Sequence, residues 1–178
     1  MGEWIIEPAT VEALPDILKI EEACFSAPWT RKMMEAELSG NPFAHFILAK
    51  SLPPCEVDCG SIVAYLCFWV VFEEVRLMNL AVIESMRHRG IAKALVTEAL
   101  ELGQAQAAVR AVLEVRASNH AAHALYLSLG FRNVSTRPKY YSNPTDDALL
   151  MELDPIVLES GQSTPAAGRE GGRIRPLQ

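Results

Sequence analysis

Apolar residues recur along this chain with two periods, and the longer period predicts helices near the amino terminus. In the segment TVEALPDILKIEEACF, residues 10 to 25, one helical face is formed by Leu14, Ile17, Leu18 and Glu21. Pro15 is tolerated because it lies in the first turn, where its missing N–H would have no partner within the helix. Thr30 predicts the N-cap of a second, short helix that ends near Gly40.

Strands are predicted next, where apolar and β-branched residues run together. The longest apolar run, IVAYLCFWVVF at residues 62 to 72, is too short to cross a bilayer and is rich in β-branched residues, so it predicts a buried strand. HFILAK at residues 45 to 50 predicts an antiparallel neighbour, joined to it by the turn-rich segment 51–61. VRLMNLAV at residues 75 to 82 predicts a further strand.

Helices and strands alternate in the second half of the chain. The helix after residue 90 carries on one face Ile91, Leu95, Ala99 and Leu102. A strand at residues 110–118 follows, and then a helix at residues 119–129, predicted to be capped by Ser118 and closed by Gly130. The last predicted strand covers residues 148–153. This order predicts an α/β fold of the mixed α+β kind, with one mixed sheet flanked by helices.

The composition changes after residue 154, and this change marks the end of the predicted domain. Residues 1–154 hold the periodic apolar positions, whereas residues 155–178 are rich in glycine and proline. We therefore expect one folded domain followed by a disordered tail. The tail arginines could touch RNA, but a solvated tail is the favoured interpretation for Arg169, Arg173 and Arg175.

Charge and cysteine content exclude several classes of protein. Half of the 178 residues are hydrophobic, which is enough for one domain with a substantial core. The formal net charge of -6 argues against a nucleic-acid binder, which needs a basic face. No signal peptide or membrane span is visible, and the four cysteines favour reduced thiols, so we expect a cytoplasmic protein. Cys55 and Cys59 lack a second Cys or His pair at zinc-site spacing, so no metal is predicted.

The first turn of the helix after residue 90 has an unusual charge pattern. RHRGIAKALV, residues 87 to 96, puts basic or titratable residues and a glycine at the start of an apolar helix. A helix start exposes N–H groups and the positive end of the helix dipole, and Gly90 lets an anion approach them. Lys93 stands at the unfavourable end of the dipole, which favours an anionic ligand. The pattern R-x-x-G-x-A suggests a diphosphate site, although basic residues at helix starts are also common surface solubilisers.

A second candidate constellation lies in LEVRASNHAAHALYLSLGF, residues 113 to 131. Glu114 shares one strand face with Arg116, so its carboxylate is either solvated or directed into a cleft between strands. Asn119 and Tyr126 lie two turns apart on the following helix, which places an amide and a phenol on one stripe. A packed tyrosine with an exposed asparagine explains the same spacing, and the residues alone favour that interpretation.

Together these segments resemble the GNAT superfamily of acetyl-CoA-dependent N-acetyltransferases. The order NLAV, RHRGIAKAL, LEVRASNHAAHALYLSLGF, KYY and DDALLM is similar to that of its RimI-type members, which acetylate the amino terminus of a ribosomal protein. SAPWT near residue 28 is similar to the Pro-Trp-Ser/Thr segment of that group. The likeness covers residues 4–154 and implies the GNAT fold, with a central twisted mixed sheet. Ala92 stands where the family often has a second glycine, and Ala108 where the long helix usually ends in glycine.

The resemblance implies a role for each matched position. Glu114 would act as general base toward the amine, and Tyr126 as general acid for the departing thiolate. The Val82 N–H would polarise the thioester carbonyl. The positions that would bind acetyl-CoA are Leu80, Ala81, Val82, His88, Arg89, Gly90, Ile91, Ala92, Lys93 and Asn119. The positions that would line the peptide side are Pro28, Trp29, Tyr140 and Tyr141.

Three functions stay open at this point. The first is metal-independent acetyl transfer from acetyl-CoA to the α-amine of a protein such as a ribosomal protein, directly in a ternary complex. The second uses the same fold to acetylate a small-molecule amine, and the SAPWT and KYY segments favour the first over it. The third is a non-catalytic module that binds acetyl-CoA. The joint presence of Glu114 and Tyr126 speaks against a module of this kind, because binding alone needs neither.

Overall fold

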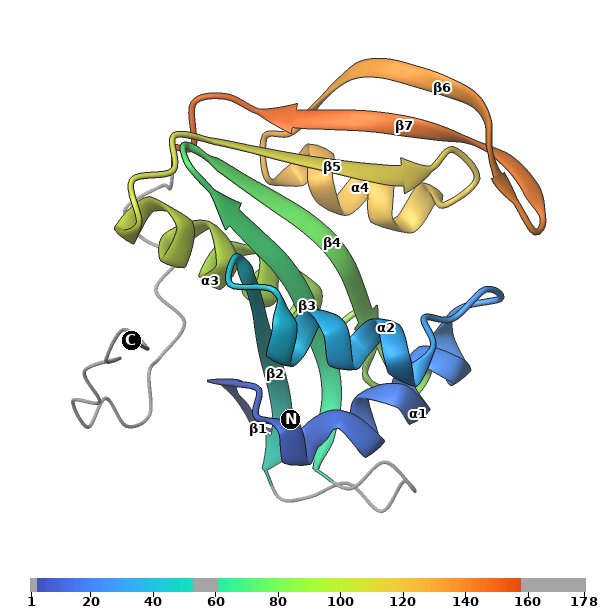
Figure 1. Cartoon of the computed structure of the whole chain (residues 1–178). Helices are drawn as coiled ribbons and strands as arrows, with labels where there is room; N and C mark the ends of the chain where they lie inside the picture. Colours follow the sequence, from blue (N-terminus) through green and yellow to red (C-terminus); the bar gives the residue numbers. More distant parts are fainter. Residues whose placement is uncertain (1–2, 53–60, 158–178) are drawn as a thin grey trace.

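A mixed sheet of seven strands forms the centre of the structure, a computed structural model that describes residues 3–52 and 61–157. The strand order is β1-β2-β3-β4-β5-β7-β6 (Figure 1). The elements in chain order are β1 (Glu3–Pro8), η1 (Val11–Ala13), α1 (Leu14–Cys24), α2 (Arg31–Glu35), η2 (Ala36–Gly40), β2 (Ala44–Leu52), β3 (Ile62–Val71), β4 (Glu74–Val82), η3 (Glu84–Met86), α3 (Ile91–Ala105), β5 (Arg110–Arg116), α4 (His120–Ser128), β6 (Arg132–Ser142) and β7 (Thr145–Leu153). The predicted mixed fold class is confirmed.

Neighbouring strands are antiparallel except at one seam. β1 pairs with β2, β2 with β3 and β3 with β4 in antiparallel register, and β7 pairs in the same way with β5 and with β6. Among the described strands only β4 and β5 are parallel, and the chain crosses from one to the other through α3. The sheet therefore consists of two antiparallel parts that meet at the β4–β5 seam.

The hydrophobic core is built around β3 and α3. β3 is buried along most of its length, as its apolar run predicts. α3 contacts β2, β3 and β4, and it buries Ile91, Leu95 and Ala99 of its predicted apolar face. Full burial of a side chain such as Leu95 contributes on the order of 1.5 to 3 kcal/mol. Gly103 occurs within α3 for a packing reason, because a Cβ at this position would collide with the side chain of Val75.

β4 and β5 separate beyond the first residues of their seam. Their parallel pairing is limited to residues 74–77 of β4 and 110–113 of β5, and past this point the strands diverge, as Figure 1 shows. The β3–β4 register shifts at Cys67 and Phe68, so that Met78 is the additional residue of β4. A bulge of this kind bends and twists its strand. The end of β4 therefore turns away from β5 and leaves a gap between them.

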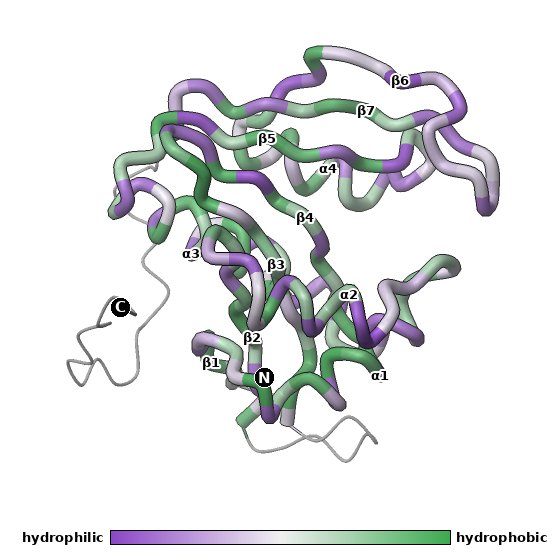
Figure 2. The backbone as a smooth tube through the Cα atoms, viewed as in Figure 1, coloured by the Kyte–Doolittle hydropathy of each residue, from purple (hydrophilic) through white to green (hydrophobic). Residues whose placement is uncertain are grey.

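Two strands were not predicted from the sequence. β1 is a short edge strand that pairs with β2, and β6 is the opposite edge strand, paired with β7. Nearly every residue of β6 is exposed, and Figure 2 shows a mostly hydrophilic chain there. Because both faces of β6 meet solvent, its sequence carries no alternation of apolar and polar residues that would reveal a strand.

The cap of α4 corrects a sequence prediction by one residue. Ser118 was expected to cap this helix, but Asn119 is the N-cap, and its side-chain oxygen accepts a hydrogen bond from the Ala122 N–H at 3.1 Å. Ser118 instead donates its hydroxyl to the carboxylate of Asp146 at 2.6 Å. Serine and asparagine are both strong N-cap residues, so propensity alone does not separate these neighbours. The other predicted cap, Thr30, is confirmed, since it accepts from the Met33 N–H at 3.3 Å.

Some sequence predictions fall outside the described residues. They concern the Cys55 and Cys59 pair and residues 158–178 of the predicted tail. Residues 155–157 are described, and Ile156 is buried and donates its N–H to the Val109 carbonyl at 2.7 Å, so the folded part extends past the predicted boundary at residue 154. Within residues 3–52 and 61–157, no helix is long and apolar enough to span a membrane.

Candidate active site

The gap between β4 and β5 holds a cavity of about 410 Å³. Its wall is formed by both strands, by α1 and the segment after it, by α4 and by the end of β6. The lining residues include Glu21, Cys24, Phe25, Trp29, Leu77, Met78, Asn79, Leu80, Glu114, Val115, Arg116, Asn119, Ala122, Tyr126 and Tyr141. Residues that are far apart in the sequence therefore line one cavity, at the place where β4 and β5 diverge (Figure 1). The two parts of the second predicted constellation, Glu114 on β5 and Asn119 with Tyr126 at α4, face the same space.

Glu114 enters this space from β5. The burial pattern of β5 alternates, with Val115 in the core and Glu114 and Arg116 on the other face, as the sequence predicted. The Glu114 side chain is 28% exposed, and its carboxylate forms an ion pair with a guanidinium nitrogen of Arg137. Arg137 belongs to β6, so it reaches this carboxylate over the intervening strand β7. Glu114 is thus a carboxylate that faces the cleft, and it has a cationic partner.

Tyr126 reaches the cavity from α4 and is almost completely buried. Only 7% of it is exposed, and its ring packs edge-on against Phe131 with the centroids 5.7 Å apart. Burial raises the pKa of the Tyr126 phenol well above its ordinary value, and the nearby Tyr141 raises it further. The phenol therefore keeps its proton at neutral pH. A protonated hydroxyl in a dry environment is suited to donate a proton or a hydrogen bond.

Asn119 and Tyr126 line one cavity, as their spacing along the helix suggested. The oxygen of the Asn119 side chain is occupied by its capping bond to Ala122. Its amide nitrogen has no hydrogen-bond partner among the described residues, so this nitrogen can donate to a ligand. Tyr126 is therefore both a packed tyrosine and a residue of the cavity wall.

An array of cations and aromatic rings forms the β6 side of the cavity. The Arg116 guanidinium lies 4.1 Å above the ring of Tyr141 and donates to the carbonyls of Asn143 and Pro144. Burial raises the pKa of Tyr141, and the charge of Glu114 raises it further. Tyr141 lines the cavity, whereas Tyr140 is 51% exposed and lies outside its lining. The paired tyrosines therefore differ in their access to the site.

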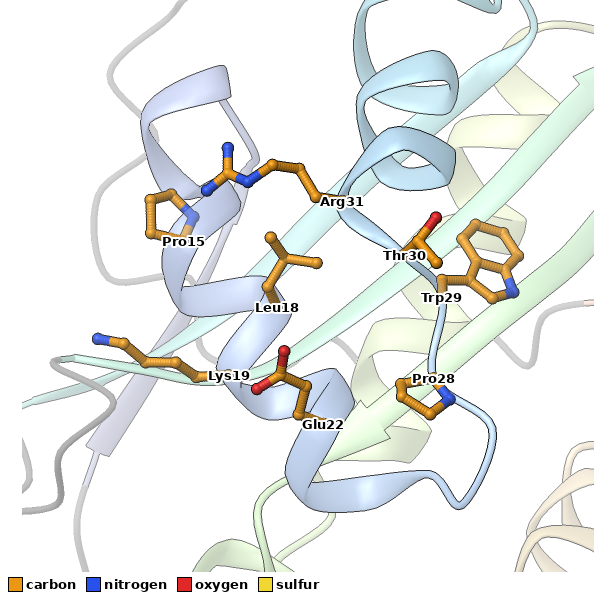
Figure 3. Close-up of a pocket in the computed structure, with 8 residues that line it drawn as sticks. All are labelled: Pro15, Leu18, Lys19, Glu22, Pro28, Trp29, Thr30 and Arg31. Carbon is orange, nitrogen blue, oxygen red and sulfur yellow. The ribbon is translucent and has the colours of Figure 1, made fainter.

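The SAPWT segment separates the cavity from a second pocket. Trp29 lines both, whereas Pro28 lines only the second one. This outer pocket has a volume of about 450 Å³ and lies between α1 and the start of α2 (Figure 3). Its α1 side is formed by Pro15, Leu18, Lys19 and Glu22, and its other side by Pro28, Trp29, Thr30 and Arg31. Of the two substrate-side residues predicted in this segment, Trp29 is thus the one that reaches the inner cavity.

Main-chain groups at the end of β4 point into the gap. The Ile83 N–H donates to the Val63 carbonyl of β3 at 3.0 Å, and Val82 lies opposite Ala64. Because the direction of main-chain groups alternates along an antiparallel ladder, the N–H of Val82 points away from β3, toward the side that β5 has left. Its carbonyl, on the same side, accepts from the Arg87 guanidinium at 3.1 Å. By the same alternation, the N–H of Leu80 points into the gap and that of Ala81 points toward β3. The side chain of Ala81 is buried.

The start of α3 presents main-chain donors to solvent. The first helical hydrogen bond runs from the Ala94 N–H to the Gly90 carbonyl at 3.0 Å, and the N–H groups of residues 88–93 have no acceptor within the described chain. Gly90 has a φ of +82°, and no atom lies within 4 Å of the place where a Cβ would stand. These residues lie outside the lining of the cavity. Open space over unpaired amides fits an anionic group such as a diphosphate.

The cavity also contains a buried carboxylate that the sequence analysis did not assign to the site. Glu21 is 1% exposed and accepts hydrogen bonds from Trp29, Asn79 and Tyr65. The helical pattern placed it among the apolar residues on one face of α1. A carboxylate on such a face is the signal that could have revealed it, since charged residues are rarely buried without a specific partner.

Cys24 bears on the expectation of direct acetyl transfer, because a cysteine thiol at the site could carry the acetyl group. The two predicted constellations contain no cysteine, but Cys24 lines the cavity beside the end of β4. Its thiol donates to the Val82 carbonyl at 3.5 Å and lies 3.8 Å from a nitrogen of Arg87. A thiol is therefore present at the site. Among the described residues, no group of three His, Cys, Asp or Glu side chains is placed to hold a metal ion.

Comparison with known proteins gives consistent matches over most of the chain. The acetyltransferase (GNAT) family matches residues 14–131. A putative ribosomal protein bS18-alanine N-acetyltransferase of Bacillus subtilis is 33% identical over 141 residues, which is 79% of this chain and 89% of that protein. The ribosomal protein bS18-alanine N-acetyltransferase of Escherichia coli is 32% identical over 142 residues, 79% of this chain and 90% of that protein. The crystal structure of the Escherichia coli ribosomal-protein-S18-alanine N-acetyltransferase matches with a TM-score of 0.74 at 28% identity, covering 90% of this chain and 98% of that one.

Proposed function

Because this chain belongs to the GNAT family of acetyltransferases, we propose that it transfers the acetyl group of acetyl-CoA to the amino-terminal α-amine of a protein in the cytoplasm. The substrate proposed is a ribosomal protein that begins with alanine, since the relatives at 32–33% identity are named for that reaction. The observation that carries the proposal is the cavity between β4 and β5, in which Glu114 and Tyr126 line one space. Family membership confirms the resemblance drawn from the sequence motifs.

The energetics of proton removal favour an α-amine over a lysine side chain. An α-amine with a pKa of about 8 costs about 1 to 1.5 kcal/mol to deprotonate at pH 7, whereas a lysine near 10.4 costs about 4.6 kcal/mol. A single carboxylate base meets the smaller requirement more easily. Glu114 supplies this base, and its carboxylate retains contact with solvent.

The described residues divide the reaction among three groups. Glu114 takes the proton of the amine, directly or through one water. The N–H of Val82 points to the gap and stabilises the negative charge that develops on the carbonyl oxygen under attack. Tyr126 carries a proton at neutral pH, and burial raises its pKa further above the ordinary value; it donates this proton to the departing thiolate. When bound, acetyl-CoA supplies the activated acyl carbon. The amides of residues 88–93 and the Asn119 side chain are the groups that would hold it.

Direct transfer in a ternary complex is the proposed order of events, and Cys24 is the group that could provide another route. Acetylation of its thiol before the peptide arrives would split the reaction into two steps. The thiol instead donates to a main-chain carbonyl. Cys24→Ala is therefore expected to retain turnover, and initial-velocity plots for the wild type are expected to intersect. Parallel plots, or an acetyl group found on Cys24 by mass, would contradict direct transfer.

The test of the proposed function is acetylation of defined peptides. Purified protein is incubated with acetyl-CoA and short peptides that differ in their first two residues, each with one internal lysine. We expect a mass increase of about 42 Da on the α-amine and loss of its positive charge, with the best turnover for alanine in the first position. Acetylation of lysine alone, or of a polyamine in preference to every peptide, would contradict the proposal.

A further inference from the structure

Glu21 is a buried carboxylate at the wall of the active-site cavity, and the proposed proton transfers leave it without a role. It lies on α1, is 1% exposed, and lines the same space as Glu114 and Tyr126. A charged side chain that is almost fully buried is costly to keep unless its surroundings or a ligand compensate for it. The position of Glu21 beside the substrate cavity therefore calls for a functional explanation.

Every partner of Glu21 is a donor. Trp29 donates its main-chain N–H at 2.8 Å, and the Asn79 amide donates to both carboxylate oxygens at 3.0 Å. Tyr65 donates its hydroxyl. Burial raises the pKa of Tyr65, and the charge of Glu21 raises it further. A donor-only environment is the one that an ionised carboxylate needs, because a protonated carboxyl would itself have a hydrogen to donate and would need an acceptor.

Among the described residues, Glu21 has no ion-pair partner. Within residues 3–52 and 61–157, no nitrogen of Lys, Arg or His lies within 4.0 Å of its carboxylate. Glu114, the other cavity carboxylate, differs because Arg137 pairs with it. Arg116, which also lines the cavity, is directed to Tyr141 and to main-chain carbonyls. The cavity therefore carries a negative charge that only neutral donors solvate.

We propose that Glu21 is a specificity-determining residue whose charge attracts the protonated amino terminus of the substrate into the cavity. This inference rests on the proposed function, because it assumes a cationic amine as substrate. Four hydrogen bonds occupy the acceptor positions of the carboxylate. Glu21 therefore acts on the ammonium through its field, which is weakly screened because the side chain is 1% exposed, and Glu114 is left to accept the proton.

Glu21 also fixes the wall against which the substrate lies. Its bond to the Trp29 N–H ties the segment after α1 to the helix, and its bonds to Asn79 tie the same point to β4 next to the bulge. A purely structural role would support every ligand of the cavity equally. A role in charge selection distinguishes ligands by the presence of the ammonium group alone.

The test compares two ligands on three proteins. Dissociation constants are measured in the presence of coenzyme A, so that no turnover occurs, for an alanine-first peptide and for its des-amino analogue. The proteins are the wild type, Glu21→Gln and the matched control Glu22→Gln. Gln keeps the size of Glu and removes its charge. Glu22 is the exposed neighbour that lines the outer pocket and not the cavity (Figure 3).

We expect Glu21→Gln to weaken the amino peptide about tenfold while it changes the des-amino peptide less than about twofold. Glu22→Gln is expected to change neither by more than about twofold. Equal weakening of both peptides by Glu21→Gln, or no weakening of either, would overturn the inference. Failure of the proposed function gives a different result, because the wild type would then acetylate none of the peptides.

A second measurement avoids any dependence on how the variant folds. In carbon-13-labelled wild-type protein bound to coenzyme A, the carboxyl resonance of Glu21 is followed as each peptide is added. The amino peptide is expected to move this resonance further than the des-amino peptide does. Equal displacement by the two peptides would show that Glu21 does not sense the ammonium and would overturn the inference.

Discussion

At the scale of single residues, the two proposed catalytic groups differ in their exposure to solvent and in their neighbours. Glu114 remains 28% exposed and has a guanidinium partner, whereas Tyr126 is 7% exposed and packs against Phe131. Burial raises the pKa of Tyr126. A hydrated carboxylate and a dry phenol are suited to opposite tasks, the first to accept a proton and the second to donate one. The surroundings of the two groups therefore support the roles we propose.

Substitution of either group tests this division. Glu114→Gln is expected to lower kcat by a factor of about 100 to 10,000, and Tyr126→Phe by a factor of about 100, because each variant loses one proton-transfer partner. Steady-state kinetics with an alanine-first peptide gives kcat, and calorimetry gives the acetyl-CoA affinity, which is expected to stay unchanged. Glu152→Gln is the matched control, since Glu152 has similar exposure and also faces an arginine, Arg110, but is not among the residues that line the cavity. Normal turnover by both Glu114→Gln and Tyr126→Phe would contradict the assigned roles.

At the scale of elements, the start of α3 depends on one backbone conformation. Gly90 has a left-handed φ of +82° and stands before the amides that we propose bind the diphosphate. An alanine meets no atom there, so its cost is backbone strain of about 1 kcal/mol or more. Relief of this strain would reorient the amides. Gly90→Ala is therefore expected to weaken acetyl-CoA about fivefold to tenfold by calorimetry. Gly40→Ala is the control, because a Cβ at Gly40 also meets no atom and its φ lies outside the left-handed region. Equal affinities in the two variants would count against the amide site.

Another element-scale contact joins the start of α4 to β7. Asp146 accepts from the hydroxyl of Ser118 at 2.6 Å and from its N–H at 3.3 Å. The hydroxyl bond is the main cause that lowers the pKa of Asp146 in the folded state. A lowered folded pKa gives stability that is present above the unfolded value of about 3.9 and is lost as the pH falls through the folded pKa. Asp146→Asn is thus expected to lower Tm at pH 7 and to match the wild type near pH 2 in thermal scans. A difference in Tm that persists at low pH would refute the charge dependence.

At the scale of the whole molecule, burial decides how far the fold can be predicted from the sequence. β3 and α3 were predicted because one or more of their faces lie in the core and the residues follow the matching period. β6 was missed because it lies at an exposed edge, where any polar sequence is tolerated. The N-cap of α4 was misplaced by one residue because neighbouring residues had equal propensity.

The sequence predicted part of the candidate site, namely the residues that belong to family motifs. Family motifs pointed to Glu114, Asn119 and Tyr126, which the fold places around one cavity. Glu21 and Cys24 were not assigned to the site because their place beside β4 depends on how α1 packs against the sheet. The apolar face on which Glu21 lies indicated its burial but not its neighbours. The ion pair of Glu114 with Arg137 depends on the β6–β7 hairpin pairing with β5, and the polar sequence of β6 does not reveal a strand.

The predicted carboxy-terminal tail gives a further prediction at the scale of the whole molecule. All seven described strands and every residue of the cavity wall precede residue 158. A protein shortened to residues 1–157 is therefore expected to fold and to keep kcat/KM for the alanine-first peptide within about twofold of the full chain. Peptide kinetics and thermal denaturation of the two proteins provide the comparison. A large loss of activity with unchanged Tm would place a functional contribution in residues 158–178.

The central claim is that acyl transfer occurs in the gap between β4 and β5, and a structure with a bisubstrate conjugate tests it most directly. The conjugate joins coenzyme A through an acetyl bridge to the α-nitrogen of an alanine-first peptide, and its crystal structure with this protein is determined. We predict that the bridge lies between Glu114 and Tyr126 while the diphosphate contacts the amides of residues 88–93. A bridge bound outside this gap, with either side chain turned away from it, would contradict the account.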